Sequence, residues 1–92
     1  MARKKDVNNI AVVAKALGHP ARIKIVEFLR KKGSCICGEI NEQVDLSPST
    51  VSEHLKILKK AELICGEIQG VKRCYCLNTK NFRLLADYLN KF

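Results

Sequence analysis

Residues 46–58 read Leu-Ser-Pro-Ser-Thr-Val-Ser-Glu-His-Leu-Lys-Ile-Leu, and this stretch decides the fold. Ser47 is a favourable helix N-cap, and Pro48 suits the first helical position because its fixed backbone angle fits there. A helix is therefore expected from this point to about Ala61. Apolar residues recur along it at helical spacing and are expected to face the core. These residues are Val51, Leu55 and Leu58.

The remaining face of this helix is polar and basic, which favours contact with DNA. Small hydroxyl side chains in the first turns let a helix approach phosphates and base edges. The free N–H groups at the helix start also suit a phosphate. Taken singly, a Ser/Thr run is more often a simple cap, and a lysine run is more often a solvated face. The candidate DNA contacts on this helix are Ser47, Ser49, Thr50, Ser52, Glu53, His54, Lys56, Lys59 and Lys60.

Downstream of this helix the apolar residues begin to alternate, which is typical of β-strands. Residues 63–68 and 71–77 flank Gln69-Gly70, so we expect a β-hairpin with Gln69-Gly70 as its two-residue turn. Lys72 and Arg73 would lie at the tip of this hairpin. There they could run along the DNA backbone or the minor groove, and both are further candidate DNA contacts.

Helical patterns also precede and follow this central region, and Gly or Pro residues separate them. A basic arm, residues 1–7, opens the chain. The expected elements are helices over 8–17, from Pro20 to a cap at Gly33, over 37–44 after a brief extended piece at 34–37, and over 80–91 after a cap at Thr79. This order defines a mainly α fold with a β-hairpin wing, which is a winged helix-turn-helix. One domain, residues 8–92, would serve both DNA binding and dimerisation.

Length and charge narrow the classes of function. The chain has 92 residues, enough for one small domain, and a net charge of +8, which points to a polyanionic partner. No apolar run is long enough to cross a membrane, and the basic start lacks the apolar region of a signal peptide, so we expect a cytoplasmic protein. No set of nucleophile, base and orienting group is visible, which argues against an enzyme. The absence of Trp argues against a base-stacking platform for single strands.

The chain resembles the ArsR-type (arsenic repressor) family of metal-sensing transcriptional repressors over nearly its whole length. The segments that carry the resemblance are residues 17–22, 36–40, 46–58 and 61–64. The resemblance implies a homodimer built from the first and last helices, with two recognition helices that read operator DNA about one helical turn apart. Pro48 stands where members often carry Gln, which removes one base contact, and Glu53 is an acidic departure.

The resemblance also points to a soft-metal site. The segment Cys35-Ile36-Cys37 occupies the position of the family's Cys-x-Cys metalloid site, but Ile40 stands where the arsenic-sensing pattern has a third Cys. The last helix has no His for the zinc site known in relatives. In winged helices the short strand commonly pairs with the second wing strand, which would supply the missing thiols. The candidate ligands are Cys35, Cys37, Cys74 and Cys76, with Cys65 as a fifth.

Thiolates favour soft ions, so the expected ligand is As(III), Cd(II) or Zn(II), without an organic cofactor. Binding of the ion would release the repressor from its operator. A second interpretation is a thiol-redox regulator, because the expected hairpin register places Cys65 opposite Cys74, where a disulfide could form. A third is a zinc-stabilised module that docks on an acidic protein. The thiols could also be small buried hydrophobic groups.

Overall fold

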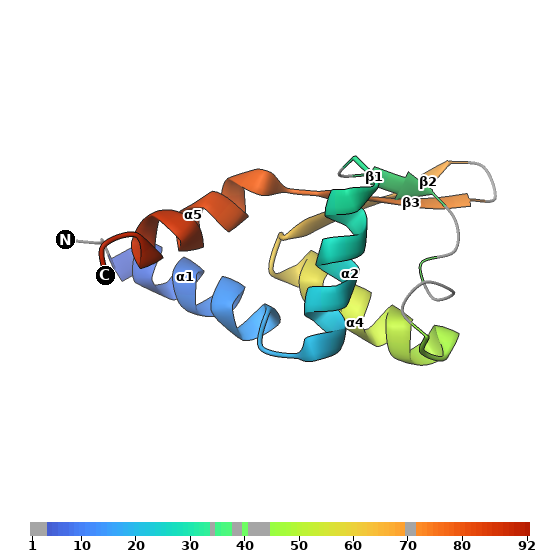
Figure 1. Ribbon diagram of the computed structural model, residues 1–92, viewed down its shortest axis with the longest axis horizontal. Helices are drawn as coiled ribbons and strands as arrows, with labels where there is room; N and C mark the ends of the chain where they lie inside the picture. The colour runs from blue at the N-terminus through green and yellow to red at the C-terminus, as the bar shows by residue number, and fades with distance from the viewer. Residues whose placement is uncertain (1–3, 34, 38–39, 41–44, 70–71) are drawn as a thin grey trace.

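The computed structural model describes residues 4–33, 35–37, 40, 45–69 and 72–92. Two helices and a three-stranded sheet form a head, and two further helices lie side by side as an extension that carries both chain ends (Figure 1). The molecule is accordingly elongated, with extents of 45 × 24 × 21 Å. The head consists of α2 (Pro20–Lys31), β1 (Cys35–Cys37), α4 (Pro48–Lys60), β2 (Ile64–Gln69) and β3 (Lys72–Leu77), and the extension of α1 (Lys4–Ala16) and α5 (Thr79–Leu89).

The start of α4 follows the expectation from its sequence. Ser47 is the N-cap, its Oγ accepts a hydrogen bond from the N–H of Thr50 at 3.4 Å, and Pro48 is the first helical residue. The inward face is also confirmed, because Val51, Leu55 and Leu58 are all buried. These local signals sufficed because they concern hydrogen bonds and packing within a few residues of the cap.

The end of α4 is a Schellman motif, in which backbone N–H groups beyond the helix bond to its last free carbonyls. The N–H of Leu63 donates to the carbonyl of Leu58, and the N–H of Glu62 donates to the carbonyl of Lys59. Glu62 has φ +59° at the position where glycine is usual. The motif is kept because Leu63 and Leu58 are both fully buried, so their packing fixes the turn.

The two helices near the chain start differ from expectation in one boundary. The first helix was expected to begin at residue 8, but α1 begins at Lys4, so residues 4–7 of the expected arm are helical. Asp6 lies in its first turn, where a negative charge complements the helix dipole. The second helix is as expected, since it begins at Pro20 and ends before Gly33, which has φ +83°.

The C-terminal helix begins at Thr79 rather than after it, and Asn78 is its N-cap in place of Thr79. The Asn78 side chain does not cap α5; its Nδ2 donates to the carbonyl of Glu62 at 2.8 Å. The expected helix over 37–44 lies outside the described residues, apart from Cys37, which belongs to β1, and Ile40, which is buried.

The sheet has the strand order β1-β3-β2 and is antiparallel throughout. The hairpin register differs by two residues from the expected one: Gln69, not Glu67, pairs with Lys72, so residues 70–71 rather than 69–70 separate the strands. Gly66 pairs with Tyr75, whose ring comes within 3.1 Å of the point that a Cβ on Gly66 would occupy. The close approach of this ring to a glycine favours the observed register over the one that would pair Glu67 with Lys72. A slip of two residues leaves the described side chains of both strands on the same faces.

The hydrophobic core lies in the head, between α2, α4 and the sheet. Its most deeply buried side chains include Ile25, Leu29, Leu58 and Leu63. The extension reaches this core only at one end, where Val13 and Ala16 of α1 are buried. No residue of α5 is buried. None of the described helices has the length and apolar character needed to span a bilayer.

Candidate nucleic-acid interface and thiol site

The first turn of α4 presents a cluster of hydroxyl groups at the surface. Ser47 Oγ lies 2.8 Å from Thr50 Oγ1 and 3.3 Å from Ser49 Oγ, and all three residues are exposed. Ser52, one turn further along, is half-buried. Hydroxyl groups can both donate to phosphate oxygens and exchange hydrogen bonds with base edges. The start of α4 therefore offers the surface that a recognition helix requires.

Exposed charges continue along the same helix. Lys56, Lys59 and Lys60 are exposed, and Glu53 forms an i,i+3 ion pair with Lys56 at 3.6 Å. Both partners of this pair are more than 70% exposed, so it adds little to stability but reduces the positive potential near Lys56. The Nζ of Lys59 lies against Gly66 of β2, 3.5 Å from the point where a Cβ would stand. The end of α4 and the wing hairpin thus lie next to each other.

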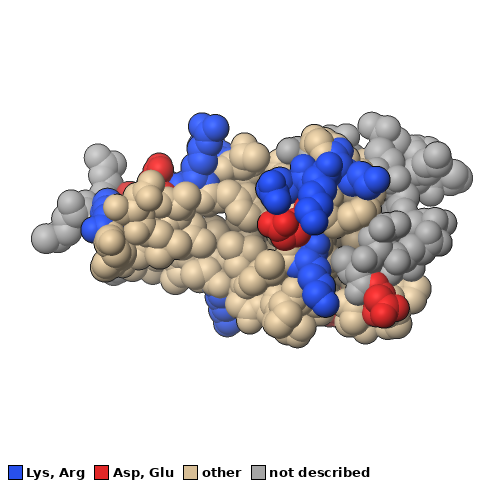
Figure 2. All heavy atoms as spheres, viewed as in Figure 1, with Lys and Arg blue, Asp and Glu red and all other residues tan. Residues whose placement is uncertain are grey.

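The head as a whole is rich in basic side chains. Figure 2 shows Lys and Arg gathered over α2, while the visible face of the extension is mostly uncharged. The last turn of α2 contributes Arg30 and Lys31, of which Arg30 pairs with Glu27 at 3.1 Å. This distribution fits a nucleic-acid partner at the head.

The assignment of His54 to the DNA-facing surface is wrong. Its side chain is only 9% exposed, because position 54 falls within the apolar stripe of α4 formed by Val51, Leu55 and Leu58. Arg22 Nη1 donates to His54 Nδ1 at 3.3 Å, and the ring of His19 lies 4.6 Å from that of His54 between centroids. His54 is therefore a packing and positioning residue of the head.

The contacts of His54 define its charge state. A guanidinium can only donate, so Nδ1 of His54 must be an unprotonated acceptor. Burial lowers the pKa of His54, electrostatic interactions with His19 and Arg22 lower it further, and Glu53 opposes them. The neutral ring is the form that fits this site.

Sequence reasoning missed Arg22, which joins three helices. Its Nε donates to the carbonyl of Ala16 at the end of α1, while its Nη1 reaches His54 on α4. His19 caps α2, with Nδ1 accepting from the N–H of Ala21 at 3.1 Å. Arg22 and His19 lie in the segment 17–22 that carries part of the family resemblance, and the pairing of a buried His with Arg is visible only in three dimensions.

The wing residues Lys72 and Arg73 lie at the hairpin end of β3. Their Cα partners on β2 are Gln69 and Ile68. The structure describes the backbone of these two residues but not their side chains.

The cysteines gather on the sheet as expected, through the pairing of β1 with β3. Cys35 is opposite Cys76, and Cys37 is opposite Cys74. Cys35 and Cys76 form a disulfide. Cys74 is buried and is also disulfide-bonded. Cys65, by contrast, is an exposed free thiol.

The expected opposition of Cys65 and Cys74 is wrong. Cys65 is opposite Cys76, because of the two-residue difference in register, and Cys74 is opposite Glu67. Within the part of the chain that the structure describes, no three His, Cys, Asp or Glu side chains are arranged to hold a metal ion. The geometry seen here is that of an oxidised sheet.

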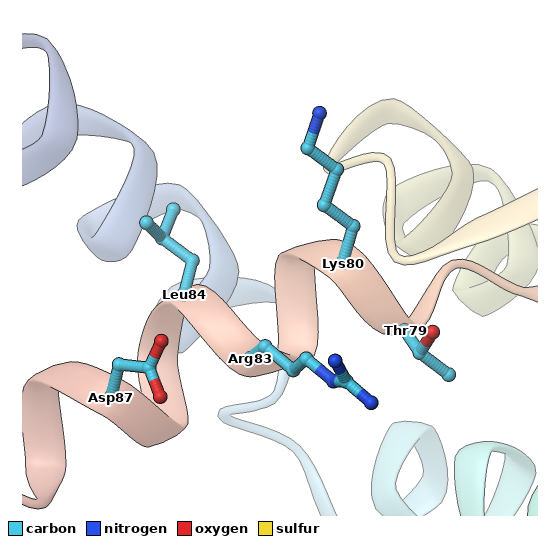
Figure 3. Close-up of a pocket in the computed structure, with 5 residues that line it drawn as sticks. All are labelled: Thr79, Lys80, Arg83, Leu84 and Asp87. Carbon is cyan, nitrogen blue, oxygen red and sulfur yellow. The ribbon is translucent and has the colours of Figure 1, made fainter.

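An open hollow of about 420 Å³ lies along α5 (Figure 3). Its lining comes from this one helix, and the side chains point in different directions instead of converging (Figure 3). The lining residues are Thr79, Lys80, Arg83, Leu84 and Asp87. This hollow is separate from both α4 and the cysteines, and it does not have the convergent polar groups of a ligand site.

A short strand, an exposed hydroxyl-rich helix and a β-hairpin beside it define a winged helix-turn-helix DNA-binding domain. Residues 19–65 match the family model of the bacterial regulatory proteins of the arsR family. The chain therefore belongs to the arsR family, and it is a DNA-binding transcriptional regulator rather than an enzyme.

Individual relatives agree with this assignment. The chain is 40% identical over 78 residues to the transcriptional repressor SdpR of Bacillus subtilis (strain 168), covering 85% of this chain and 82% of that protein. It is 30% identical over 82 residues to the arsenical resistance operon repressor of Staphylococcus xylosus, covering 89% of this chain and 74% of that protein. A homodimeric winged helix-turn-helix domain from Mycobacterium bovis, Mb0332, has the same fold, with a TM-score of 0.72, 22% identity, and 97% of this chain and 84% of that chain covered.

Proposed function

We propose that the protein is a homodimeric repressor that inserts α4 of each subunit into the major groove of an operator duplex. The observation that carries this proposal is the exposed hydroxyl cluster of Ser47, Ser49 and Thr50 at the start of α4, followed by exposed lysines on the same helix. Lys72 and Arg73 on β3 would add contacts from the wing. Several relatives at 30% identity or more are repressors by name, which supports repression over activation. Such a regulator acts on the chromosome, so we place it in the cytoplasm.

The extension supports a dimer. Among the described residues, most of the large apolar side chains that remain exposed lie on α1 and at the end of α5: Val7, Val12, Leu89 and Phe92. A second copy of the same pair of helices would cover them. The Mycobacterium bovis domain with this fold is homodimeric, and two-fold symmetry would place two recognition helices on one palindromic site.

The proposed signal is a soft ion bound by the thiols of Cys35, Cys37, Cys74 and Cys76, with Cys65 as a further candidate. Thiolates suit As(III), Cd(II) and Zn(II), and the pairing of β1 with β3 brings the four backbone positions into two adjacent pairs. The donor set fits such an ion once the Cys35–Cys76 bond and the disulfide of Cys74 are both reduced. The name of the Staphylococcus xylosus relative favours arsenite among these ions.

The chain itself explains how these thiols could influence DNA binding. β1 precedes α4 in the sequence, and β2 and β3 follow it, so the thiols hold together the two segments that flank the recognition helix. An ion bound there would favour one distance between β1 and β3. Release from the operator requires that the ion bind the DNA-free form more tightly, typically by about 1–3 kcal/mol.

A second candidate signal is thiol oxidation, and the Cys35–Cys76 disulfide specifically favours it. This disulfide replaces the Cys65–Cys74 pair that the sequence suggested. It links the same two segments that the ion would link, so either chemistry could act on α4.

Fluorescence anisotropy of a labelled duplex from the region upstream of the gene tests these proposals. The fully reduced protein should bind with a steep salt dependence, and As(III), Cd(II) or Zn(II) should weaken binding while Mg(II) does not. A Cys35→Ser/Cys76→Ser variant should bind DNA and lose the response, and a Cys65→Ser variant measures whether the fifth cysteine contributes to it. Equal DNA affinity with and without all three ions would exclude metal sensing.

The same assay separates the alternatives. Loss of affinity on treatment with a disulfide-forming oxidant, reversed by a reductant, would favour the redox signal. The absence of any salt-sensitive duplex binding would exclude the repressor and favour a zinc-stabilised module that docks on an acidic protein.

A further inference from the structure

Three cysteines lie in one row across the sheet. β3 is the central strand, and its Cys76 has Cys35 of β1 as its partner on one side and Cys65 of β2 on the other. Residues paired in register project to the same face of a sheet, so all three side chains lie on one face. Cys35 and Cys65 are exposed, and Cys76 is half-buried. Cys76 can therefore be reached by a thiol from either side.

The backbone spacing on the Cys65 side is compatible with a bond. The N–H of Asn78 donates to the carbonyl of Leu63 at 2.8 Å, which marks residues 63 and 78 as a hydrogen-bonded pair. Such pairs alternate along an antiparallel ladder, so Cys65 and Cys76 form the next hydrogen-bonded pair, with Cα atoms about 5.5 Å apart. This separation is close to the commonest Cα–Cα distance in disulfides. On the other side, the Cα atoms of Cys35 and Cys76 are 4.0 Å apart.

We propose that Cys65 is an exchange thiol that moves the disulfide of Cys76 from β1 to β2. The Cys65 thiolate attacks Cys76 Sγ, a Cys65–Cys76 bond forms, and the Cys35–Cys76 bond breaks. The electron pair of the broken bond leaves on Cys35 Sγ, which takes up from water the equivalent of the proton that Cys65 had released. No oxidant or reductant is consumed. The order β2-β3-β1 places the attacking cysteine and the leaving cysteine on opposite sides of Cys76.

The transfer changes what the disulfide constrains. The Cys35–Cys76 bond spans a sequence separation of 41 and encloses the whole of α4 in a covalent loop. The Cys65–Cys76 bond would close only the hairpin and would release Cys35 of β1 from Cys76 of β3. The exchange thus opens the covalent loop that Cys35–Cys76 closes around α4 and generates a Cys35 thiol. The proposal rests on strand register and not on metal sensing or operator release, so it stands or fails separately from them.

A chain with three cysteines gives the clearest test. In a Cys37→Ser/Cys74→Ser variant only the three thiols of the row remain, and trypsin places them in separate peptides, 33–56, 61–72 and 74–80. The variant is mildly oxidised and incubated at mildly alkaline pH, because the attacking species is the thiolate. It is then quenched in acid and labelled with a maleimide before digestion. Adding Cys65→Ser to this background provides the matched control.

We expect the label to move from Cys65 to Cys35 with time, and peptide 61–72 to become joined to peptide 74–80. Labelling of Cys35 should be at least tenfold higher than in the Cys65→Ser control. Label that stays on Cys65 at all times, or that appears on Cys76, would overturn the proposal.

A second measurement covers the case in which the substituted chain does not fold. In the oxidised wild-type chain, peptide 61–72 has Cys65 as its single cysteine, so any link from it identifies this thiol. A Cys65–Cys76 link found by fragmentation supports the exchange. A peptide 61–72 that remains unlinked, or is linked to Cys74, contradicts it.

Discussion

His54 lies in the middle of α4, yet its ring faces the protein. The guanidinium of Arg22 holds its Nδ1 at 3.3 Å and also bonds the carbonyl of Ala16, so this one arginine connects α1, α2 and α4. The orientation of α4 relative to α2 therefore depends on a neutral imidazole. This dependence gives the fold a sensitivity to acid.

We expect the stability of the protein to fall as the pH drops below about 6.5, the ordinary pKa of histidine. The pKa of His54 is lowered in the folded chain, first by burial and then by His19 and Arg22, so the unfolded chain takes up the proton first. The stabilisation that neutral His54 gives the folded chain is complete above that pH, and it is lost as the pH falls through the folded-state pKa. Thermal melts at about pH 7.5 and about pH 5.5 measure it.

A His54→Gln variant is the control, because its amide oxygen can accept from Arg22 but does not titrate. Its melting temperature should depend less on pH over the same interval. An equal acid response in both proteins would show that His54 is not responsible.

Glu62 is a second position where one residue determines local geometry. Its φ of +59° is costly for a residue with a Cβ, and it is tolerated because the buried pair Leu58 and Leu63 closes the Schellman motif. Its carbonyl is also held by Asn78 at 2.8 Å and Asn81 at 3.0 Å from the start of α5. These bonds use the backbone, so a substitution of the side chain leaves them in place.

The variant Glu62→Gly should be more stable than the wild type by about 0.5–1 kcal/mol, since glycine adopts positive φ without strain but loses more freedom on folding. Urea unfolding at neutral pH measures the difference. Glu62→Ala removes the same charge and keeps the strain. If Ala and Gly variants were equally stable, the backbone explanation would be wrong.

At the scale of the element, α4 combines two opposed electrostatic features. Its exposed lysines favour DNA, while Glu53 pairs with Lys56 at 3.6 Å and offsets part of that charge. The Glu53–Lys56 pair is well exposed and contributes at most about 1 kcal/mol to the free energy of folding. We expect its main effect on the affinity for DNA. Glu53 weakens the phosphate contacts, which form with DNA of any base sequence. Base contacts therefore account for a larger share of the affinity.

We expect Lys56→Ala to weaken duplex binding and to reduce the slope of log affinity against log salt by about 0.9. Glu53→Gln should strengthen binding several-fold because it frees Lys56. Anisotropy titrations over a range of salt concentrations measure both effects. Lys91→Ala, at the far end of the extension, is the control with the same charge change. An unchanged slope for Lys56→Ala would place Lys56 outside the interface.

At the scale of the whole molecule, the elongated shape separates two tasks. The head contains the core, α4 and the cysteines, and the extension carries apolar side chains that the monomer leaves exposed. Val12 and Leu89 are 50% and 56% exposed in the extension, compared with 49% for Ile23 on α2 in the head. Equal exposure in two regions allows a matched comparison.

Leu89→Glu and Val12→Glu should convert the proposed dimer to a monomer and reduce operator affinity at least tenfold, because each subunit would then contact only one half-site. Sedimentation equilibrium reports the mass, and anisotropy reports the affinity. Ile23→Glu should leave the mass unchanged. Dimers that persist in both extension variants would exclude α1 and α5 as the interface.

The sequence by itself determined the elements whose signals are local. Ser47 and Pro48 begin α4, Gly33 ends α2, and the alternation after Leu63 marks the hairpin, because caps and periodicity depend on neighbours a few residues away. The segments around His19 and residues 46–58 also sufficed to suggest the arsR family, and the match over residues 19–65 confirmed it.

Only the tertiary structure decided which distant residues meet. The hairpin register depends on Tyr75 packing over Gly66, and that register gives Cys65 the partner Cys76. The buried position of His54 depends on Arg22, 32 residues away along the chain. A stripe of apolar residues shows that a helix face is buried, but not that a polar residue within the stripe has found a partner. That outcome depends on how separate elements pack, and sequence spacing carries no record of it.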